Sequence, residues 1–235
     1  MIDRERLIQT AAGFGVALSA QQAALLDGYA ELLCEKNKVM NLTAITDPDG
    51  VEVKHLLDSL LCAAQPEIAG RVADVGTGAG FPGAVIRVLK PEVALTFIDA
   101  TAKKLGFIEE SCAALGLQAE TVHGRAEELA HKPEFREQFD CVTARAVANL
   151  PALCEYCLPL VKVDGWFVAM KGPEAPAELD QAKVALRALG GEAKELRRFG
   201  LPDGSERVLV VIKKISQTST KYPRSGKNIT KKPII

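Results

Sequence analysis

Apolar residues recur at helical spacing near the N-terminus and form short runs from residue 72 onward. The helical spacing predicts three helices over 3–14, 20–36 and 47–65, the second of which begins with a capping box at Ser19. Because no strand pattern interrupts them, residues 1–66 are predicted to form a helical segment. Such a segment preceding the core could form a lid or a substrate-binding cap.

The short apolar runs alternate with helical patterns over the next part of the chain. A Rossmann-like α/β fold follows from this alternation, since parallel strands need helical crossovers. A final pair of strands around the turn at 201–205 predicts an antiparallel closure, which gives a seven-stranded sheet. We expect the core to span 67–213 and a tail to span 214–235. The predicted strands are 72–75, 93–99, 119–123, 139–145, 166–171, 192–199 and 207–212.

A glycine-rich loop follows the first predicted strand. Its glycines stand at positions 76, 78, 80 and 83, and Pro82 suits the first turn of the helix that follows. We expect this helix to present free backbone N–H groups at its N-terminus, where the polar end of a nucleotide-like cofactor would bind.

Two cofactor patterns overlap in this loop. Gly78-x-Gly80-x-x-Gly83 matches the dinucleotide fingerprint, whereas Gly76-x-Gly78-x-Gly80 with Asp74 upstream resembles motif I of the S-adenosylmethionine methyltransferases. In the resembled enzymes that acid lies near the cationic end of the cofactor, while a pyrophosphate gains nothing from it. Asp99, at the end of the next strand, would hold ribose hydroxyls of either cofactor. The motif favours S-adenosylmethionine over a dinucleotide or a ligand-free turn that Asp74 merely caps.

All five predicted parallel strands end in charges or glycine. Since ligands in open α/β sheets bind beyond the carboxyl ends of the strands, we expect these groups to lie around one site. Arg145 and Lys171 could alternatively be ordinary surface charges. The groups are Asp74 with the glycines, Asp99, Gly124–Glu127, Arg145 and Lys171.

Composition excludes several classes of protein. The 235 residues contain no apolar run of eighteen, and the first residues carry no secretory signal, so no membrane association is expected. The six cysteines lie in apolar surroundings typical of a reduced, cytoplasmic protein. Cys154 and Cys157 form an isolated CxxC without a second pair, so we expect two buried residues and no metal site.

The net charge of −1 is unevenly distributed. From Lys213 to Ile235 there are six Lys and one Arg and no acid, so the rest of the chain is acidic. A uniformly basic nucleic-acid binder is therefore excluded, whereas a basic C-terminal arm is present. This arm could bind phosphates, or it could be a solvated tail.

Motifs spread over nearly the whole chain point to one family. They are His55-Leu-Leu-Asp-Ser59, Asp74-Val-Gly-Thr-Gly-Ala-Gly-Phe-Pro-Gly83, Arg145-Ala-Val-Ala, Lys171-Gly172 and the basic tail from Lys221 to Pro233. Together they resemble the bacterial 16S ribosomal RNA guanine-N7 methyltransferases, the RsmG or glucose-inhibited division protein B (GidB) family. The middle of the tail, Ser225–Thr230, departs from the proline-rich form expected in this family.

The resemblance implies a class I methyltransferase fold and methyl transfer from S-adenosylmethionine to N7 of a guanine in the 530 loop of 16S rRNA, within a small-subunit particle. It implies cofactor contacts at Gly76 and Phe81, an adenine site flanked by Ala126 and Glu127, and Arg145 beside the methyl donor. The candidates on the RNA side are His55, Asp58, Ser59, Lys171, Lys221 and Arg224. A monomer is expected.

The reaction fits the residues present. Guanine N7 has a free lone pair and loses no proton before it attacks a methyl group, so no general base is required. The chain also lacks the Asn-Pro-Pro-Tyr motif of amino-group methyltransferases and the Pro-Cys nucleophile of cytosine-C5 enzymes. Arg145 stands in place of the former, where its fork could orient guanine O6 or a phosphate. A small-molecule methyltransferase and a non-catalytic ribosome-assembly module are the alternatives.

Overall fold

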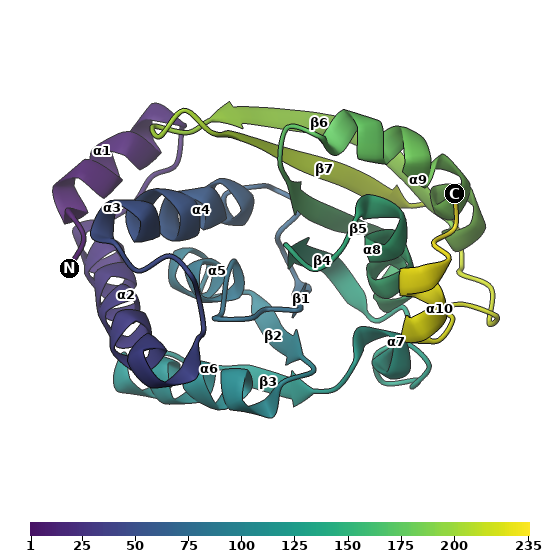
Figure 1. Ribbon diagram of the computed structural model, residues 1–235, viewed down its shortest axis with the longest axis horizontal. Helices are drawn as coiled ribbons and strands as arrows, with labels where there is room; N and C mark the ends of the chain where they lie inside the picture. Colours follow the sequence, from purple (N-terminus) through teal and green to yellow (C-terminus); the bar gives the residue numbers. More distant parts are fainter.

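A seven-stranded sheet with the strand order β3-β2-β1-β4-β5-β7-β6 forms the centre of the computed structural model, which describes residues 1–235 (Figure 1). The first five strands pair in parallel, and β7 pairs antiparallel with both β5 and β6. The predicted strands and their α/β class are confirmed, although β5 begins earlier than expected. The strands are β1 Arg71–Val75, β2 Ala94–Asp99, β3 Glu120–His123, β4 Phe139–Arg145, β5 Val161–Lys171, β6 Gly191–Gly200 and β7 Glu206–Lys214.

Helices from the first half of the chain cover one face of the sheet. They share one cluster of 37 buried apolar residues with strand residues such as Val72 and Val168. The N-terminal helices therefore pack into the same core as the sheet, and their role as a lid or substrate-binding cap stays a prediction. The helices are α1 Arg4–Gly13, α2 Ala20–Met40, α3 Pro48–Gly50, the π-helical turn η1 Val51–Leu57, α4 Asp58–Ala63, α5 Gly83–Leu89 and α6 Ala102–Ala114.

Helices from the second half cover the opposite face. Their apolar side chains form a second cluster of 25 buried residues with Ala73, Val142 and Phe167 of the sheet. Because both faces are covered, the parallel strands read as continuous apolar runs in the sequence. These helices are α7 Ala126–Leu129, α8 Leu150–Cys157, the 3-10 turn η2 Leu158–Leu160, α9 Ala175–Leu189 and α10 Gly226–Lys231.

The glycines of the loop after β1 serve two different purposes. Gly76, Gly78 and Gly80 adopt positive φ angles of 66°, 59° and 90°, which glycine tolerates best. A Cβ atom on Gly80 would overlap the hydroxyl of Tyr29, which donates a 3.0 Å hydrogen bond to the carbonyl of Ala79. Part of the glycine pattern thus reflects packing against α2 and not the approach of a ligand.

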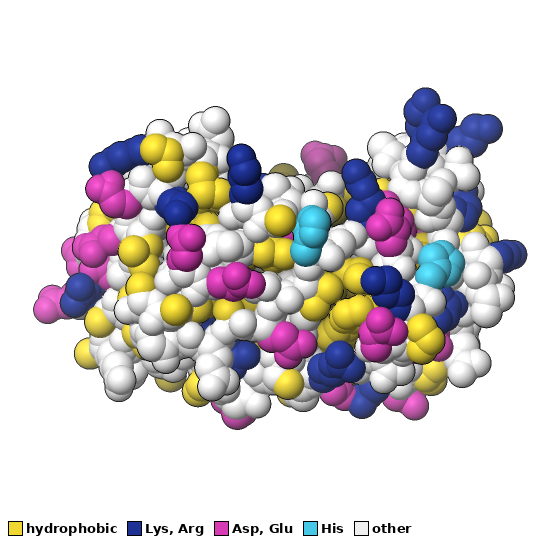
Figure 2. Space-filling model, turned by 90° about the horizontal axis from the view of Figure 1, so that it is seen from below, with side chains coloured by type: hydrophobic (Ala, Val, Ile, Leu, Met, Phe, Trp, Pro, Cys, Tyr) yellow, Lys and Arg dark blue, Asp and Glu magenta, His cyan; other side chains and the backbone are white.

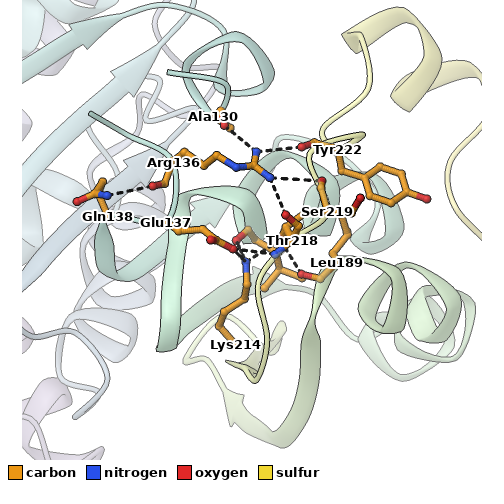
Figure 3. A network of polar contacts seen from close by, with 10 residues as sticks. Ala130, Arg136, Glu137, Gln138, Leu189, Lys214, Thr218, Ser219 and Tyr222 are labelled. Atoms are coloured by element: carbon orange, nitrogen blue, oxygen red, sulfur yellow. Dashed lines mark hydrogen bonds and ion pairs between the residues drawn. The ribbon is translucent and has the colours of Figure 1, made fainter. Parts of the chain in front are cut away.

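The basic tail is anchored to the core by a polar network (Figure 3). Lys214 is fully buried at the end of β7, where its Nζ contacts Glu137 at 3.0 Å and Thr218 at 2.6 Å. Burial lowers the pKa of Lys214 to about 8, while the Glu137 carboxylate opposes this shift. Arg136 donates to the carbonyls of Thr218 and Tyr222 at 2.7 and 3.0 Å. The alternative of a wholly solvated tail is wrong for these residues.

None of the helices combines the length and the apolar character needed to cross a membrane. All six cysteines are free thiols, and Cys154 and Cys157 are buried as predicted. No three His, Cys, Asp or Glu side chains are arranged to hold a metal ion.

Candidate functional site

A cavity of about 420 Å³ lies at the carboxyl ends of β1 and β2. Four of the predicted cofactor residues line it, namely Gly76, Asp99, Ala126 and Glu127. The loops after β1, β2, β3 and β4 supply its walls, as expected for ligand sites in open α/β sheets. Arg125 is the only Lys or Arg among its lining residues. With Asp99 and Glu127 against this one cation, the lining offers a pyrophosphate little positive charge.

Asp99 is a buried residue of the cavity wall, and its carboxylate is held in place. Its Oδ2 accepts the backbone N–H of Gly78 at 3.0 Å and its Oδ1 accepts that of Thr101 at 2.8 Å. Each carboxylate oxygen can accept a further hydrogen bond. The side chain is thus preorganised to receive hydroxyl donors from a ligand.

Asp74 lies beneath the glycine loop and not in the cavity. Its Oδ2 accepts the Thr77 hydroxyl at 2.6 Å and the N–H of Gly83 at 2.9 Å, while Oδ1 has no hydrogen-bond partner. Complete burial raises the pKa of this carboxyl to about 6, although the two donors oppose the shift. Asp74 therefore shapes the loop from below.

The N-terminus of α5 does not present free donors. Besides the bond from Gly83 to Asp74, the N–H of Ala84 donates to the carbonyl of Gly80, and the N–H groups of Val85 and Ile86 donate to that of Pro82. Pro82 itself is the N-cap residue. The expectation that this helix presents free N–H groups is wrong, because these donors already have internal partners. Binding of a cofactor at this loop stays a prediction.

A second cavity of about 450 Å³ lies beside the ends of β4 and β5. It brings together four more of the predicted residues, His55, Asp58, Arg145 and Lys171. Lys54 and Arg207 add two cations, whereas Glu174 and Glu178 add two acids. Positive groups outnumber negative ones in this lining, in contrast to the first cavity.

Arg145 is the most constrained side chain of the second cavity. Its Nη1 contacts Asp58 Oδ2 at 3.1 Å and the carbonyl of Lys54 at 2.9 Å, and its guanidinium lies over the ring of Phe81. Asp58, only 2 % exposed, also pairs with Arg207 at 3.1 Å. Arg145 is thereby fixed by residues that lie far from it in the sequence.

His55 stacks on Phe81 with ring centroids 4.9 Å apart and lies 3.3 Å from Arg145 Nη2. Since the guanidinium can only donate, His55 Nδ1 must accept, which leaves the proton on Nε2 facing the Thr43 hydroxyl at 2.8 Å. Burial, together with the charge of Arg145, lowers the pKa of His55 to about 4. His55 is therefore neutral around pH 7.

The loop after β4 separates the two cavities. Ala146 lines the second cavity, whereas Val147 and Ala148 line the first. Lys171 holds this loop by donating to the carbonyl of Ala148 at 3.0 Å, and it also pairs with Glu178 at 2.7 Å. A group bound in either cavity would therefore lie close to a group bound in the other.

Several predicted site residues lie outside both cavities. Phe81 is buried beneath His55, and Ser59 is completely buried with an unpartnered hydroxyl. Arg224 is engaged by Glu155, with Nη2 2.6 Å from Oε2. Lys221 is exposed and lies over the ring of Tyr222. Gly78 and Gly80 belong to the loop but not to the cavity lining.

Other lining residues were not singled out from the sequence. Asn149 lines the first cavity. Its place just before a predicted helix is typical of an N-cap residue. Its side chain does accept the backbone N–H of Ala152 at 3.2 Å. Val147 belongs to the motif Arg145-Ala-Val-Ala but had no assigned role. Tyr156, Thr230 and Arg207 carry no local signal, because only the tertiary fold brings them to the cavities.

The sequence matches known proteins over almost its entire length. The family model described as "GidB: rRNA small subunit methyltransferase G" matches residues 22–209. The chain belongs to the GidB family. It is 46% identical to ribosomal RNA small subunit methyltransferase G of Geobacillus sp. over 94% of both chains, and 44% identical to that of Exiguobacterium sp. over 100% of both.

Solved structures with low sequence identity share the fold of this GidB-family chain. TrmN from Thermus thermophilus has a TM-score of 0.51 at 22% identity, covering 67% of this chain and 49% of its own. The YcgJ protein from Bacillus subtilis has a TM-score of 0.53 at 16% identity, covering 69% and 100%. The fold is that of the class I methyltransferases, which confirms the predicted fold class.

Replacement of His55 should change how stability depends on pH. The lowered pKa of His55 means that the folded chain binds fewer protons than the unfolded chain between about pH 6.5 and pH 4, so stability falls as the pH falls through this range. In His55→Gln this loss should be smaller by roughly 2 kcal/mol at pH 4.5. The measurement is urea unfolding between pH 7.5 and 4.5.

The exposed His123 provides the control, since His123→Gln removes a histidine without disturbing a buried contact. Because the pKa of Asp74 is raised, its contribution to stability grows as the pH falls over an overlapping range. The effect of His55 is therefore obtained by comparing the curves of the variants, and not from the wild-type curve alone. Identical pH dependence in wild type and His55→Gln would contradict the neutral, buried state of His55.

Proposed function

We propose that this protein transfers the methyl group of S-adenosylmethionine to N7 of a guanine in the 530 loop of 16S rRNA, and that it acts on this base within a small-subunit particle. Membership of the GidB family supports the substrate class. The observation that carries the proposal is the pair of adjacent cavities separated by the loop after β4, the second of which brings Arg145 and Lys171 together.

The first cavity fits the nucleoside part of S-adenosylmethionine. Its volume is within the range of small-molecule sites, and Ile98, Ala126 and Ala152 give it apolar walls suited to a purine. Asp99 offers carboxylate lone pairs to ribose hydroxyls, as described above. When bound there, the cofactor supplies a sulfonium-activated methyl group. A Cβ atom at Gly76 would overlap Val147, so glycine here lets the loop after β4 pack against the loop after β1 beside the first cavity.

The second cavity fits an extruded guanine. N7 carries its lone pair on the edge of the base that also bears O6, an edge that arginine and lysine recognise well. Arg145 and Lys171 line this cavity, and both are held in fixed positions. Because N7 needs no deprotonation, the reaction does not require His55 or another residue to act as a general base. Orientation of the two reactants can supply about 7–11 kcal/mol of the barrier reduction.

Exposed lysines of the tail would contact RNA phosphates. Figure 2 shows Lys and Arg side chains projecting at the upper right, on the side where Figure 1 places α10, next to a hollow in the outline. Four tail lysines are exposed and form no ion pair, whereas Lys214 and Arg224 are committed to internal partners. The four are Lys221, Lys227, Lys231 and Lys232.

The tests below also distinguish two alternative functions. A small-molecule methyltransferase would use the same first cavity but would have no use for the exposed lysines of the tail. A non-catalytic assembly module would bind RNA without methyl turnover. Transfer of label to RNA distinguishes the proposal from both.

The decisive assay incubates the protein with methyl-labelled S-adenosylmethionine and small ribosomal subunits from cells that lack this activity, and then maps the label. One N7-methylguanine in the 530 loop is expected. Subunits from cells that retain the activity serve as the control, since their target base is already methylated. Cofactor binding without RNA methylation would contradict the proposal and favour a small-molecule substrate or a binding role.

Arg145→Lys should lower the methylation rate by about 100-fold, because lysine keeps the charge but loses the fork that contacts both Asp58 and His55. Cofactor affinity should change little, since Arg145 does not line the first cavity. Single-turnover methylation measures the rate. Arg198→Lys, an exposed replacement of the same type, is the control. Full activity of Arg145→Lys would refute its role in orienting the base.

Replacing Lys221, Lys227, Lys231 and Lys232 with serine should weaken RNA binding and flatten its salt dependence. Each lost contact to a single-stranded phosphate lowers the magnitude of the slope of log K against log salt by about 0.7, so the slope should fall by up to about 3. RNA affinity measured between low and moderate salt gives the slope.

A matched set of exposed lysines outside the tail provides the control for this variant. Each of these lysines pairs with an acid, so their removal should leave the slope nearly unchanged. They are Lys38, Lys162, Lys183 and Lys194. Equal slopes for wild type and the tail variant would show that the tail makes no phosphate contacts.

A further inference from the structure

The C-terminal helix α10 borders the first cavity, beside α7 and α8 (Figure 1). Thr230 of α10 and Tyr156 of α8 both line this cavity. The Thr230 hydroxyl donates to the carbonyl of Gly226 at 2.9 Å, so the Tyr156 hydroxyl, 3.3 Å away, must be the donor to Thr230. The tail is thereby joined to the core at the cavity wall.

Gly226 stands directly against Glu127, which lines the same cavity. A Cβ atom at Gly226 would overlap the Glu127 Oε1 atom. The backbone of Gly226 has no positive φ angle, so glycine is needed here for close approach and not for backbone conformation. The tail therefore limits where the Glu127 carboxylate can lie, and the side chain of Glu127 is only 9% exposed.

The chain just before α10 is fixed by buried contacts. Glu155 of α8 is completely buried and accepts from the Arg224 backbone at 2.7 Å and from its guanidinium at 2.6 and 2.9 Å. His131 contacts the carbonyl of Pro223 at 2.9 Å. Since breaking one partner of a buried ion pair is costly, this segment is held firmly in place.

We propose that α10 is a wall of the cofactor site, with Thr230 and Tyr156 as residues that contact the nucleoside and Gly226 as the residue that positions Glu127. This inference rests on the proposed cofactor, because it assigns the first cavity to S-adenosylmethionine. The tail then has two faces with different tasks. Its inner face completes the nucleoside site before any RNA is bound, and its exposed lysines remain available to phosphates.

Binding of S-adenosylhomocysteine, measured by calorimetry without RNA, tests the inference. In Gly226→Ala the added methyl group must displace Glu127, and the Kd should rise about tenfold, equivalent to about 1.4 kcal/mol. Gly106→Ala is the matched control, because Gly106 also lies in a helix but has open space at its Cβ position. Its Kd should equal that of the wild type.

A second variant that ends at Arg224 removes α10 but keeps the anchors of Lys214, Thr218 and Arg224. It should lose at least as much affinity as Gly226→Ala, while a melting curve verifies that it folds. Wild-type affinity in both variants would overturn the inference and leave the cofactor assignment intact, as expected for a tail that serves RNA alone. Failure of the wild-type protein to bind S-adenosylhomocysteine would overturn the proposed cofactor and this inference together.

Discussion

The Asp74 carboxylate holds together the loop on which both cavities depend. One of its oxygens ties Thr77 to Gly83 across the glycine turn. A buried polar group that loses its partner costs about 1–3 kcal/mol, so the loop has little freedom to open. Gly76 consequently faces the first cavity, and Phe81 lies beneath His55 at the second. A single buried acid thus holds in shape a loop whose residues border the first cavity and support His55 at the second.

The second cavity depends on contacts between the N-terminal helices and the sheet. His55 and Asp58 come from the segment before β1, yet they determine the position of Arg145 at the end of β4. Arg207 reaches the same carboxylate from β7. Three distant parts of the chain therefore meet at the Asp58 carboxylate. The first 66 residues can fix a side chain of the sheet in this way because they share its core.

The sequence predicted the fold well because buried parallel strands and their helices leave periodic patterns that are local in the chain. It also placed Asp99 and Arg145, the last residues of β2 and β4, at one edge of the sheet, because the carboxyl ends of parallel strands meet there. It could not predict that α5 would satisfy its own N-terminal donors, since this depends on the rotation of the Asp74 side chain beneath the loop. Nor could it predict Tyr156 or Thr230 at the cavity, because their approach depends on how the tail docks.

The docking of α10 also has a consequence for the synthesis of the protein. Thr230 borders a cavity whose other walls are built from residues 75–156. That cavity is therefore complete only after the chain has been synthesised through α10, long after its other walls. A nascent chain that does not yet include α10 would carry an unfinished pocket.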